Sequence, residues 1–306
     1  MIAPPDYHIH TRFSCDSKTA VMAACEAAIT RGMREIAVTD HADFEPLDEG
    51  CGYLRADAYL AEIERCRRKY DGTLTIRTGV EIGEGHVHRD RAAALLEAHE
   101  FDFVLGSLHW VNGHPTWDGR YFGRHTLTEG LRAYFDELTH LAAEADYDVL
   151  AHFGIVRRAA YKAFKLQTLD YAPYEGAIRR ILRILIERGN GLEINTATCR
   201  RGMGAPSPTL QVLRWYRQMG GEILTLGSDA HISDAIGAHF DTALDLAREA
   251  GFTRLGTYEK REPRWVELPR HRNGVIQESI GSAIRMALSE SRAVAPSEWR
   301  HPKIEL

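Results

Sequence analysis

Residues 6–17 read DYHIHTRFSCDS, a stretch that begins with a short β-prone run carrying two histidines. Side chains two positions apart point to the same side of a β-strand, so His8 and His10 can hold one ion between them. Asp16 follows in the next loop and offers a carboxylate. The segment is therefore predicted to be a strand that leads into metal-binding side chains, and the rest of the chain repeats this arrangement.

Six further apolar runs, rich in β-branched residues, also end in residues that can bind a cation or an anion. The seven predicted strands are residues 6–10, 35–40, 74–82, 103–109, 148–153, 191–195 and 222–228. After the first strand, the groups at or just beyond the strand ends are Asp40 with His41, Glu81, His109, His152, Glu193 with Arg200, and Asp229 with His231. If the histidines were distributed by chance, they would fall on helices as often as at strand ends. Their shared position at the ends of the predicted strands therefore indicates one common site.

Amphipathic segments of helical period lie between these runs, with apolar stripes in residues 21–29, 59–70, 131–145, 178–186 and 236–247. Strands that alternate with helices predict an α/β fold with a mainly parallel sheet. The chain contains neither G-x-G-x-x-G nor G-x-x-x-x-G-K-[ST], the glycine-rich loops that open doubly wound sheets often carry. We therefore favour a TIM-like barrel, in which the C-terminal ends of the strands meet on one face and form the active site.

Residues 1–270 are predicted to form this barrel, with a terminal hairpin over residues 253–268. Residues 271–306 are predicted to be a C-terminal extension with an amphipathic helix over residues 275–289. A packed appendage is the simplest interpretation of this extension, and a dimerisation element is the alternative.

The nine candidate ligands are six imidazoles and three carboxylates: His8, His10, Asp16, His41, Glu81, His109, His152, Asp229 and His231. Nine ligands are too many for one four- to six-coordinate ion, so two or three divalent ions are expected, with Glu81 as a bridge. Mixed imidazole and carboxylate ligands suit zinc, iron or manganese. Such a cluster acidifies a bound water and stabilises both oxygens of a displacement at phosphorus, which predicts metal-assisted hydrolysis.

The composition excludes several other classes of protein. The 306 residues carry a formal net charge of −5, which argues against a protein that grips nucleic acid by its overall field. No secretory signal and no membrane-spanning run is visible in the sequence. The five cysteines are odd in number and contain no C-x-x-C pair, so we expect reduced thiols in the cytoplasm.

Seven stretches, DYHIHTRFSCDS, AVTDHAD, GVEIG, LGSLHW, LAHFGIVRR, LEINT and LGSDAH, resemble the PHP (polymerase and histidinol phosphatase) superfamily of metal-dependent phosphoesterases. They occur in the family's order and span roughly residues 1–270. The resemblance implies a distorted (β/α)7 barrel with a trinuclear site. By position, it assigns the first metal to His8, His10, Glu81 and Asp229, the second to Asp16, His41 and His231, and the third to Glu81, His109 and His152.

Within the superfamily the chain looks most like the monofunctional histidinol-phosphate phosphatases. Asp16 stands where several other branches have histidine, and the ending GTYEKREPRWVEL resembles the strand pair that closes this branch. Departures are Gly154, where an acidic residue is common, and His86 with His88 in a loop beside the site. The resemblance implies a phosphomonoesterase that converts L-histidinol phosphate to L-histidinol and phosphate in histidine biosynthesis, by attack of a metal-bridging hydroxide.

Two arginine pairs lie beside the site, and this branch uses arginines there to hold the substrate phosphate. Arg157 or Arg158, and Arg200 or Arg201, are therefore expected to bind phosphate oxygens, whose geometry matches a guanidinium fork. Two alternatives stay open: a phosphoesterase acting on another small phosphate ester or a nucleotide, and a non-catalytic metal-binding regulatory module. An oligomer is possible.

Overall fold

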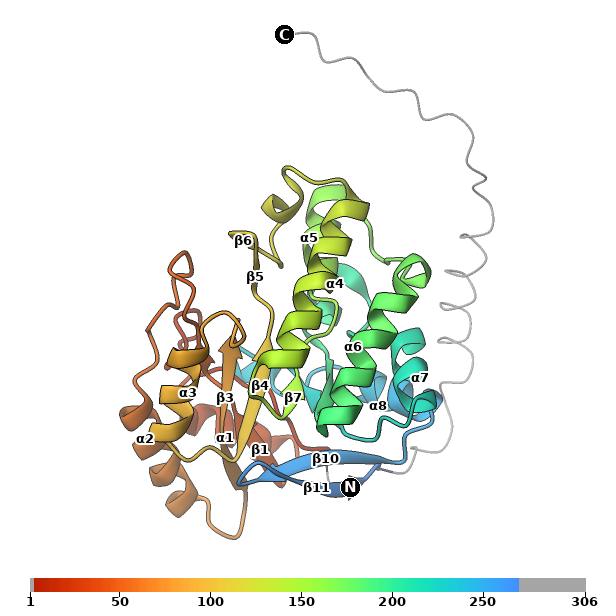
Figure 1. Ribbon diagram of the computed structural model, residues 1–306. Coiled ribbons are helices and arrows are strands. Elements are labelled where there is room, and N and C mark those ends of the chain that lie inside the picture. The colour runs from red at the N-terminus through yellow and green to blue at the C-terminus, as the bar shows by residue number, and fades with distance from the viewer. Residues whose placement is uncertain (1–2, 270–306) are drawn as a thin grey trace. The chain divides into compact units, whose positions relative to one another are not determined.

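Six parallel strands follow one another in a continuous curled sheet in the computed structural model, which describes residues 3–269 (Figure 1). Their order is β1-β3-β4-β7-β8-β9, and the short β2 pairs beside β3. The strands are β1 Glu35–Val38, β2 His41–Ala42, β3 Thr75–Gly83, β4 Phe103–Ser107, β5 Trp110–Val111, β6 His114–Pro115, β7 Val149–Leu150, β8 Gly191–Asn195, β9 Leu224–Gly227, β10 Arg254–Glu259 and β11 Glu262–Glu267.

The predicted first strand, residues 6–10, closes this sheet into a distorted barrel. The Tyr7 N–H donates to the Leu226 carbonyl of β9 (2.8 Å), and the Ala37 N–H of β1 donates to the Asp6 carbonyl (2.9 Å). The segment therefore lies between β9 and β1 and is bonded to both. This confirms the α/β barrel predicted from the sequence.

Residues 6–10 make isolated bridges and no regular strand, which differs from the prediction. Side chains replace part of the ladder here: the Ile9 N–H donates to the Thr39 hydroxyl (3.1 Å), and the Asp6 carboxylate accepts from the Ser228 N–H and the Gly237 N–H (2.9 Å each). The predicted strand over residues 148–153 is likewise shorter, since β7 holds only Val149–Leu150.

Helices pack around the outside of the sheet (Figure 1). They are α1 Val21–Thr30, α2 Ala56–Lys69, α3 Arg89–Ala98, α4 Leu127–Glu144, α5 Val156–Phe164, α6 Glu175–Arg188, α7 Leu210–Gln218 and α8 Phe240–Glu249. Each predicted stripe falls on a helix, although α8 begins four residues after Ile236. The sequence patterns missed α3, α5 and α7.

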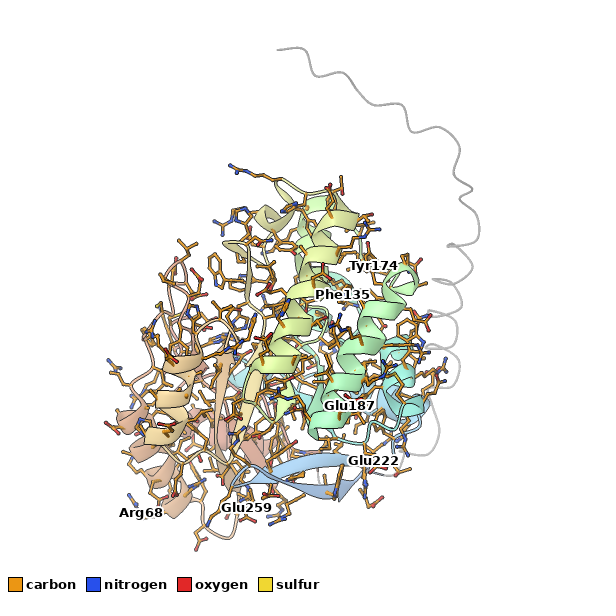
Figure 2. All side chains as sticks on the ribbon, in the orientation of Figure 1. Arg68, Phe135, Tyr174, Glu187, Glu222 and Glu259 are labelled. Carbon is orange, nitrogen blue, oxygen red and sulfur yellow. The ribbon has the colours of Figure 1, made fainter. Side chains whose placement is uncertain are left out.

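The long helix α4 shows how local sequence and packing agree. Thr126 and Glu129 form a reciprocal capping box at its N-terminus, which satisfies backbone N–H groups that the helix leaves unpaired. Its apolar stripe is buried on the barrel side. Phe135 of this stripe packs on Tyr174 at the start of α6, with ring centroids 5.5 Å apart. Figure 2 labels both side chains.

The predicted terminal hairpin is present as β10 and β11, and it runs across the lower end of the barrel (Figure 1). The Lys260 N–H donates to the Asp102 carboxylate just before β4 (3.1 Å), and the Arg261 guanidinium donates to the Asp148 carboxylate just before β7 (3.0 Å). The hairpin therefore covers the N-terminal ends of the strands and leaves the opposite face free for a site.

The predicted extension 271–306, with its helix, lies outside the described residues, as do residues 1, 2 and 270 of the predicted barrel domain. Among residues 3–269, no helix combines the length and the apolar character that a membrane crossing requires.

Candidate metal centre

The nine candidate ligands meet at the C-terminal ends of the strands. His8 and His10 come from the closing segment, His41 from β2 and Glu81 from β3. The others follow directly after strands, as His109 after β4, His152 after β7, and Asp229 and His231 after β9, while Asp16 lies in the loop before α1. The structure therefore brings together side chains spread over more than two hundred positions of the chain.

Glu81 lies at the centre of this cluster and is fully buried. Five imidazole nitrogens surround its carboxylate: His152 Nε2 (2.8 Å) and His109 Nε2 (3.3 Å) face Oε1, while His41 Nδ1 (3.1 Å), His8 Nε2 (3.2 Å) and His10 Nε2 (3.3 Å) face Oε2. A carboxylate shared among five imidazoles is placed as a bridging ligand would be.

Asp16 and Asp229 lie on the side of the cluster toward His231. Asp16 Oδ2 is 2.8 Å from His231 Nε2 and 3.8 Å from His41 Nε2. Asp229 Oδ1 is 3.6 Å from His10 Nε2 and 3.5 Å from His231 Nδ1. Asp16 is the most exposed of the nine, so this side of the cluster is open to solvent.

The hydrogen bonds of the imidazoles fit divalent cations. His8 Nδ1–H donates to Glu193 (2.7 Å), and His10 Nδ1–H donates to Ser14 Oγ (3.1 Å), whose own hydroxyl donates to Asp40. In the neutral rings the two Nε2 atoms, 3.0 Å apart, then face each other with lone pairs. A cation bound by both nitrogens converts this repulsion into coordination.

The same argument holds on the other side of the cluster. His109 Nδ1–H donates to Asp43 (3.0 Å), and His231 Nδ1–H donates to the Asp229 carbonyl (3.1 Å). Their Nε2 lone pairs therefore face the carboxylates of Glu81 and Asp16. Glu81 Oε2 has no hydrogen-bond partner among the described residues, and a metal would satisfy it.

Four groups of three ligand atoms lie close enough together to hold an ion: His8 with His10 and Asp229; His10 with His41 and His231; His41 with Glu81 and His109; and His8 with Glu81 and His152. The first group contains three of the four ligands expected for the first metal and lacks Glu81. The other groups share His8, His10, His41 and Glu81 between neighbouring positions, so the division of ligands into three separate sets stays a prediction.

Three further carboxylates orient the ligands. Glu193 accepts from His8 Nδ1 and also from the His152 N–H (2.5 Å), and Asp40 accepts from Thr11 and Ser14, so both are buried hydrogen-bonded carboxylates. Asp43 accepts from His109, a role that the sequence patterns missed. Such outer partners fix the tautomer and the direction of a ligating imidazole.

Two glycines leave room for these carboxylates. A Cβ on Gly227 would overlap Glu193 Oε1, and a Cβ on Gly83 would overlap Asp43 Oδ1. Glycine is therefore required at the ends of β9 and β3 because a carboxylate occupies the position that a methyl group would take.

The charges of the cluster shift the pKa values of its members in a consistent pattern. Burial opposes ionisation of Glu81, but the imidazoles of His8, His41 and His109 hold its pKa well below the ordinary range. Burial disfavours a protonated His41, yet Glu81 and Asp43 raise its pKa to about 10. Burial, with His41 and His231 nearby, lowers the pKa of His10 well below its ordinary value. The carboxylates are therefore ionised, and protons compete with metals for several imidazoles.

The cluster opens into a cavity of about 420 Å³. Of the four arginines expected to bind phosphate, Arg158 and Arg201 line this cavity, whereas Arg157 donates to the Ala205 carbonyl (2.5 Å) and Arg200 donates to the Ser228 carbonyl (2.6 Å). Arg120 lines it as well and was not anticipated. The geometry therefore favours Arg158 and Arg201 of the two pairs.

Arg158 lies in the first turn of α5, is buried and donates to Asp229 Oδ2 (3.1 Å). Burial lowers its pKa to about 10, so its side chain still carries a charge at neutral pH. Cys15 also lines the cavity, but burial and the carboxylates of Asp16 and Asp48 raise the pKa of this thiol to about 12, which opposes a nucleophilic thiolate. His86 pairs with Glu137 (2.7 Å), away from the cavity lining.

Comparison with known proteins agrees with this geometry. A protein of Clostridium acetobutylicum named probable histidinol-phosphatase is 29% identical over 257 residues, which cover 84% of this chain and 97% of the relative. The histidinol-phosphatase of Lactococcus lactis is 28% identical over 259 residues, covering 83% of this chain and 93% of the relative.

The crystal structure of the histidinol phosphate phosphatase of L. lactis, complexed with zinc, L-histidinol and phosphate, has the same fold, with a TM-score of 0.75 at 24% identity. The match covers 86% of this chain and all of that one. The family model of the PHP domain matches residues 6–197, which is more than half of the chain. The chain therefore belongs to the PHP domain family.

Proposed function

We propose that this protein is a metal-dependent phosphomonoesterase that hydrolyses L-histidinol phosphate to L-histidinol and phosphate, in histidine biosynthesis. The observation that carries the proposal is the cluster of six imidazoles and three carboxylates, built around the buried Glu81, that opens into a cavity lined by arginines. The names of the two relatives described above support the choice of substrate.

The nine ligands would hold two or three divalent ions of zinc, iron or manganese. Such ions, when bound, acidify a water molecule and take up charge on the phosphate oxygens. The protein itself orients these ligands, since Glu193, Asp40 with Ser14, and Asp43 fix the imidazole rings. It also limits the access of water, since the cavity leads to nine ligands of which six are buried.

Arg158 and Arg201 would bind the phosphate of the substrate. Arg158 is held against Asp229 at the edge of the cluster, and its Nε has no hydrogen-bond partner among the described residues, so it retains a free donor. A guanidinium in this position binds the non-bridging oxygens and orients the ester for in-line attack.

Metal content measured by elemental analysis, together with steady-state kinetics, tests the proposal. We expect two or three ions per chain, and we expect His10→Ala to lose metal and nearly all activity. His140→Ala is the matched control, because His140 is exposed and pairs with Glu144 outside the site. A His10→Ala protein with full metal content and full activity would refute the metal site. If L-histidinol phosphate were no better a substrate than an aryl phosphate, the assigned substrate would be wrong.

A further inference from the structure

The cavity beside the metal cluster is lined by two chemically unlike groups of residues. The first group is basic and consists of Arg120, Arg158 and Arg201. The second group is acidic and aromatic: Asp48 and Glu49 come from the loop after β2, Trp110 from β5, and Trp117 from the segment that follows β6. Phosphate accounts for the arginines, but the metal cluster and its proposed chemistry give no role to the acidic and aromatic group.

Asp48 is held in one orientation by two hydrogen bonds. The indole Nε1–H of Trp110 donates to its Oδ2 (2.6 Å), and the Gly50 N–H donates to its Oδ1 (2.7 Å). Trp110 is itself fixed, because its backbone N–H donates to the buried Glu84 (2.9 Å) and its ring meets Trp117 edge-on at 6.0 Å. A half-buried carboxylate fixed in this way is preorganised, as a ligand-binding group needs to be.

The position of Asp48 is close to the metal cluster. A Cβ on Gly50 would lie 3.0 Å from Asp48 Oδ1 and 3.1 Å from Asp43 Oδ2. Asp43 is the carboxylate that accepts from His109. Asp43 therefore lies between Asp48 and the candidate metal ligand His109. Asp48 is thus within reach of a small substrate whose phosphate binds at the metals and Arg158.

The charge of Asp48 has no ion-pair partner among the described residues. Within residues 3–269, neither Asp48 nor Glu49 forms an ion pair with a lysine, arginine or histidine. Two uncompensated carboxylates repel phosphate, so their presence in a cavity that would receive a phosphate ester calls for a positive charge elsewhere on the ligand. That the cavity receives a ligand has independent support: Arg158 lines it, is only 8% exposed, and has an unpartnered Nε.

We propose that Asp48 binds the ammonium group of the leaving alcohol, with Trp110 and Trp117 against the flat ring of the same molecule. The site would thus select phosphate esters of amino alcohols by recognising both ends of a zwitterion. Aromatic faces suit such a ligand because they attract cations and cover apolar surface. This inference rests on the proposed phosphatase function and adds the residue that gives the site its specificity.

A pair of substrates isolates this contact. L-Histidinol phosphate and its N-acetyl derivative share the phosphate and the imidazole, but only the first carries an ammonium group. We expect wild-type protein to prefer the first by at least about tenfold in kcat/KM, the effect of a hydrogen bond to a charged group, and mainly through KM. In Asp48→Asn the preference should fall to within about threefold. Glu45→Gln is the matched control, since it removes one negative charge from the same loop outside the cavity lining and should keep the preference.

The outcomes separate this inference from the proposed function. A wild-type protein that hydrolyses neither ester refutes the phosphatase function and the inference with it. A wild-type protein that hydrolyses both esters equally well refutes only the role of Asp48. An Asp48→Asn protein in which both esters slow in parallel, with the preference intact, also refutes that role, because it shows a general effect on the site.

Discussion

Replacing Gly227 by alanine should weaken metal binding although it replaces no metal ligand. Gly227 ends β9, and a Cβ there would lie 2.6 Å from the Cβ of His8 and 2.9 Å from the Cδ of Glu193. Ordinary contact begins at about 3.4 Å, so the His8 side chain would have to move by about 0.8 Å. Glu193 is 1% exposed, and its two oxygens already hold His8 and the backbone of His152.

The size of the effect follows from how closely metal ligands must be placed. A working site tolerates about 0.5 Å of displacement, so 0.8 Å exceeds the tolerance. Loss of an outer partner lowers metal affinity by about 10- to 100-fold, and overpacking a buried site costs about 1–3 kcal/mol of stability. Gly227→Ala should therefore show both effects, a weaker affinity for zinc and a lower melting temperature.

Zinc titration against a competing chelator, with urea unfolding in parallel, measures both quantities. Gly176→Ala makes the same chemical change in the first turn of α6, where no atom lies within 4 Å of the new Cβ. It should leave zinc affinity unchanged and raise stability by up to about 1 kcal/mol, because alanine favours helix more than glycine does. A Gly227→Ala protein with wild-type zinc affinity would show that the position of Glu193 does not matter to the site.

Three further predictions follow from the described contacts. Arg158→Gln should lower kcat/KM for phosphate esters by about 100-fold or more. Arg157→Gln should chiefly lower the melting temperature, since Arg157 does not line the cavity. Equal losses of kcat/KM in the two variants would contradict the assignment of phosphate binding to Arg158. Removal of metal with EDTA should lower stability by about 4 kcal/mol if free zinc had been near 1,000 times its Kd, and added zinc should restore it, as calorimetry can check. Burial raises the pKa of Asp148 from 3.8 to about 6 despite Arg261, so ionisation of this carboxyl lowers the stability of the folded state between about pH 4 and pH 6. In urea unfolding, the stability of Asp148→Asn relative to wild type should therefore rise by up to about 3 kcal/mol between pH 4 and pH 7. A stability difference that does not change with pH would refute this cost of ionisation.

The sequence predicted the barrel and the place of the cluster because a pair of metal ligands at a strand end can be recognised in two ways. One is the apolar run of the strand, and the other is the spacing of two between residues that can bind a metal. His8 and His10 combine an apolar run with the spacing of two that a strand requires, and Asp229 and His231 repeat this spacing after β9. Both pairs meet in the structure, since His10 Nε2 lies 3.6 Å from Asp229 Oδ1.

Residues whose role depends on a loop conformation left no such signal. Asp43 and Asp48 follow β2 among other acidic residues, and a carboxylate in a loop is usually solvated. Arg157 and Arg158 are neighbours in the sequence, but their side chains leave the first turn of α5 in different directions. Arg158 therefore lines the cavity, whereas Arg157 donates to a backbone carbonyl. The sequence also did not predict the irregular pairing of residues 6–10, because the side chains of Thr39 and Asp6 take the place of backbone hydrogen bonds of the ladder.

The closure of the barrel by residues 6–10 has a consequence for the order in which the protein can mature. His10 and Asp229, which share a candidate ion, are 219 positions apart in the chain. At ordinary rates of translation, about 10 to 45 s pass between the synthesis of the first and that of the second. During that time the two imidazoles of the first segment have no carboxylate from β9 to complete their site. Metal uptake by this group of ligands therefore requires that β9 and Asp229 have joined residues 6–10, and a nascent chain arrested before β9 should not retain that ion.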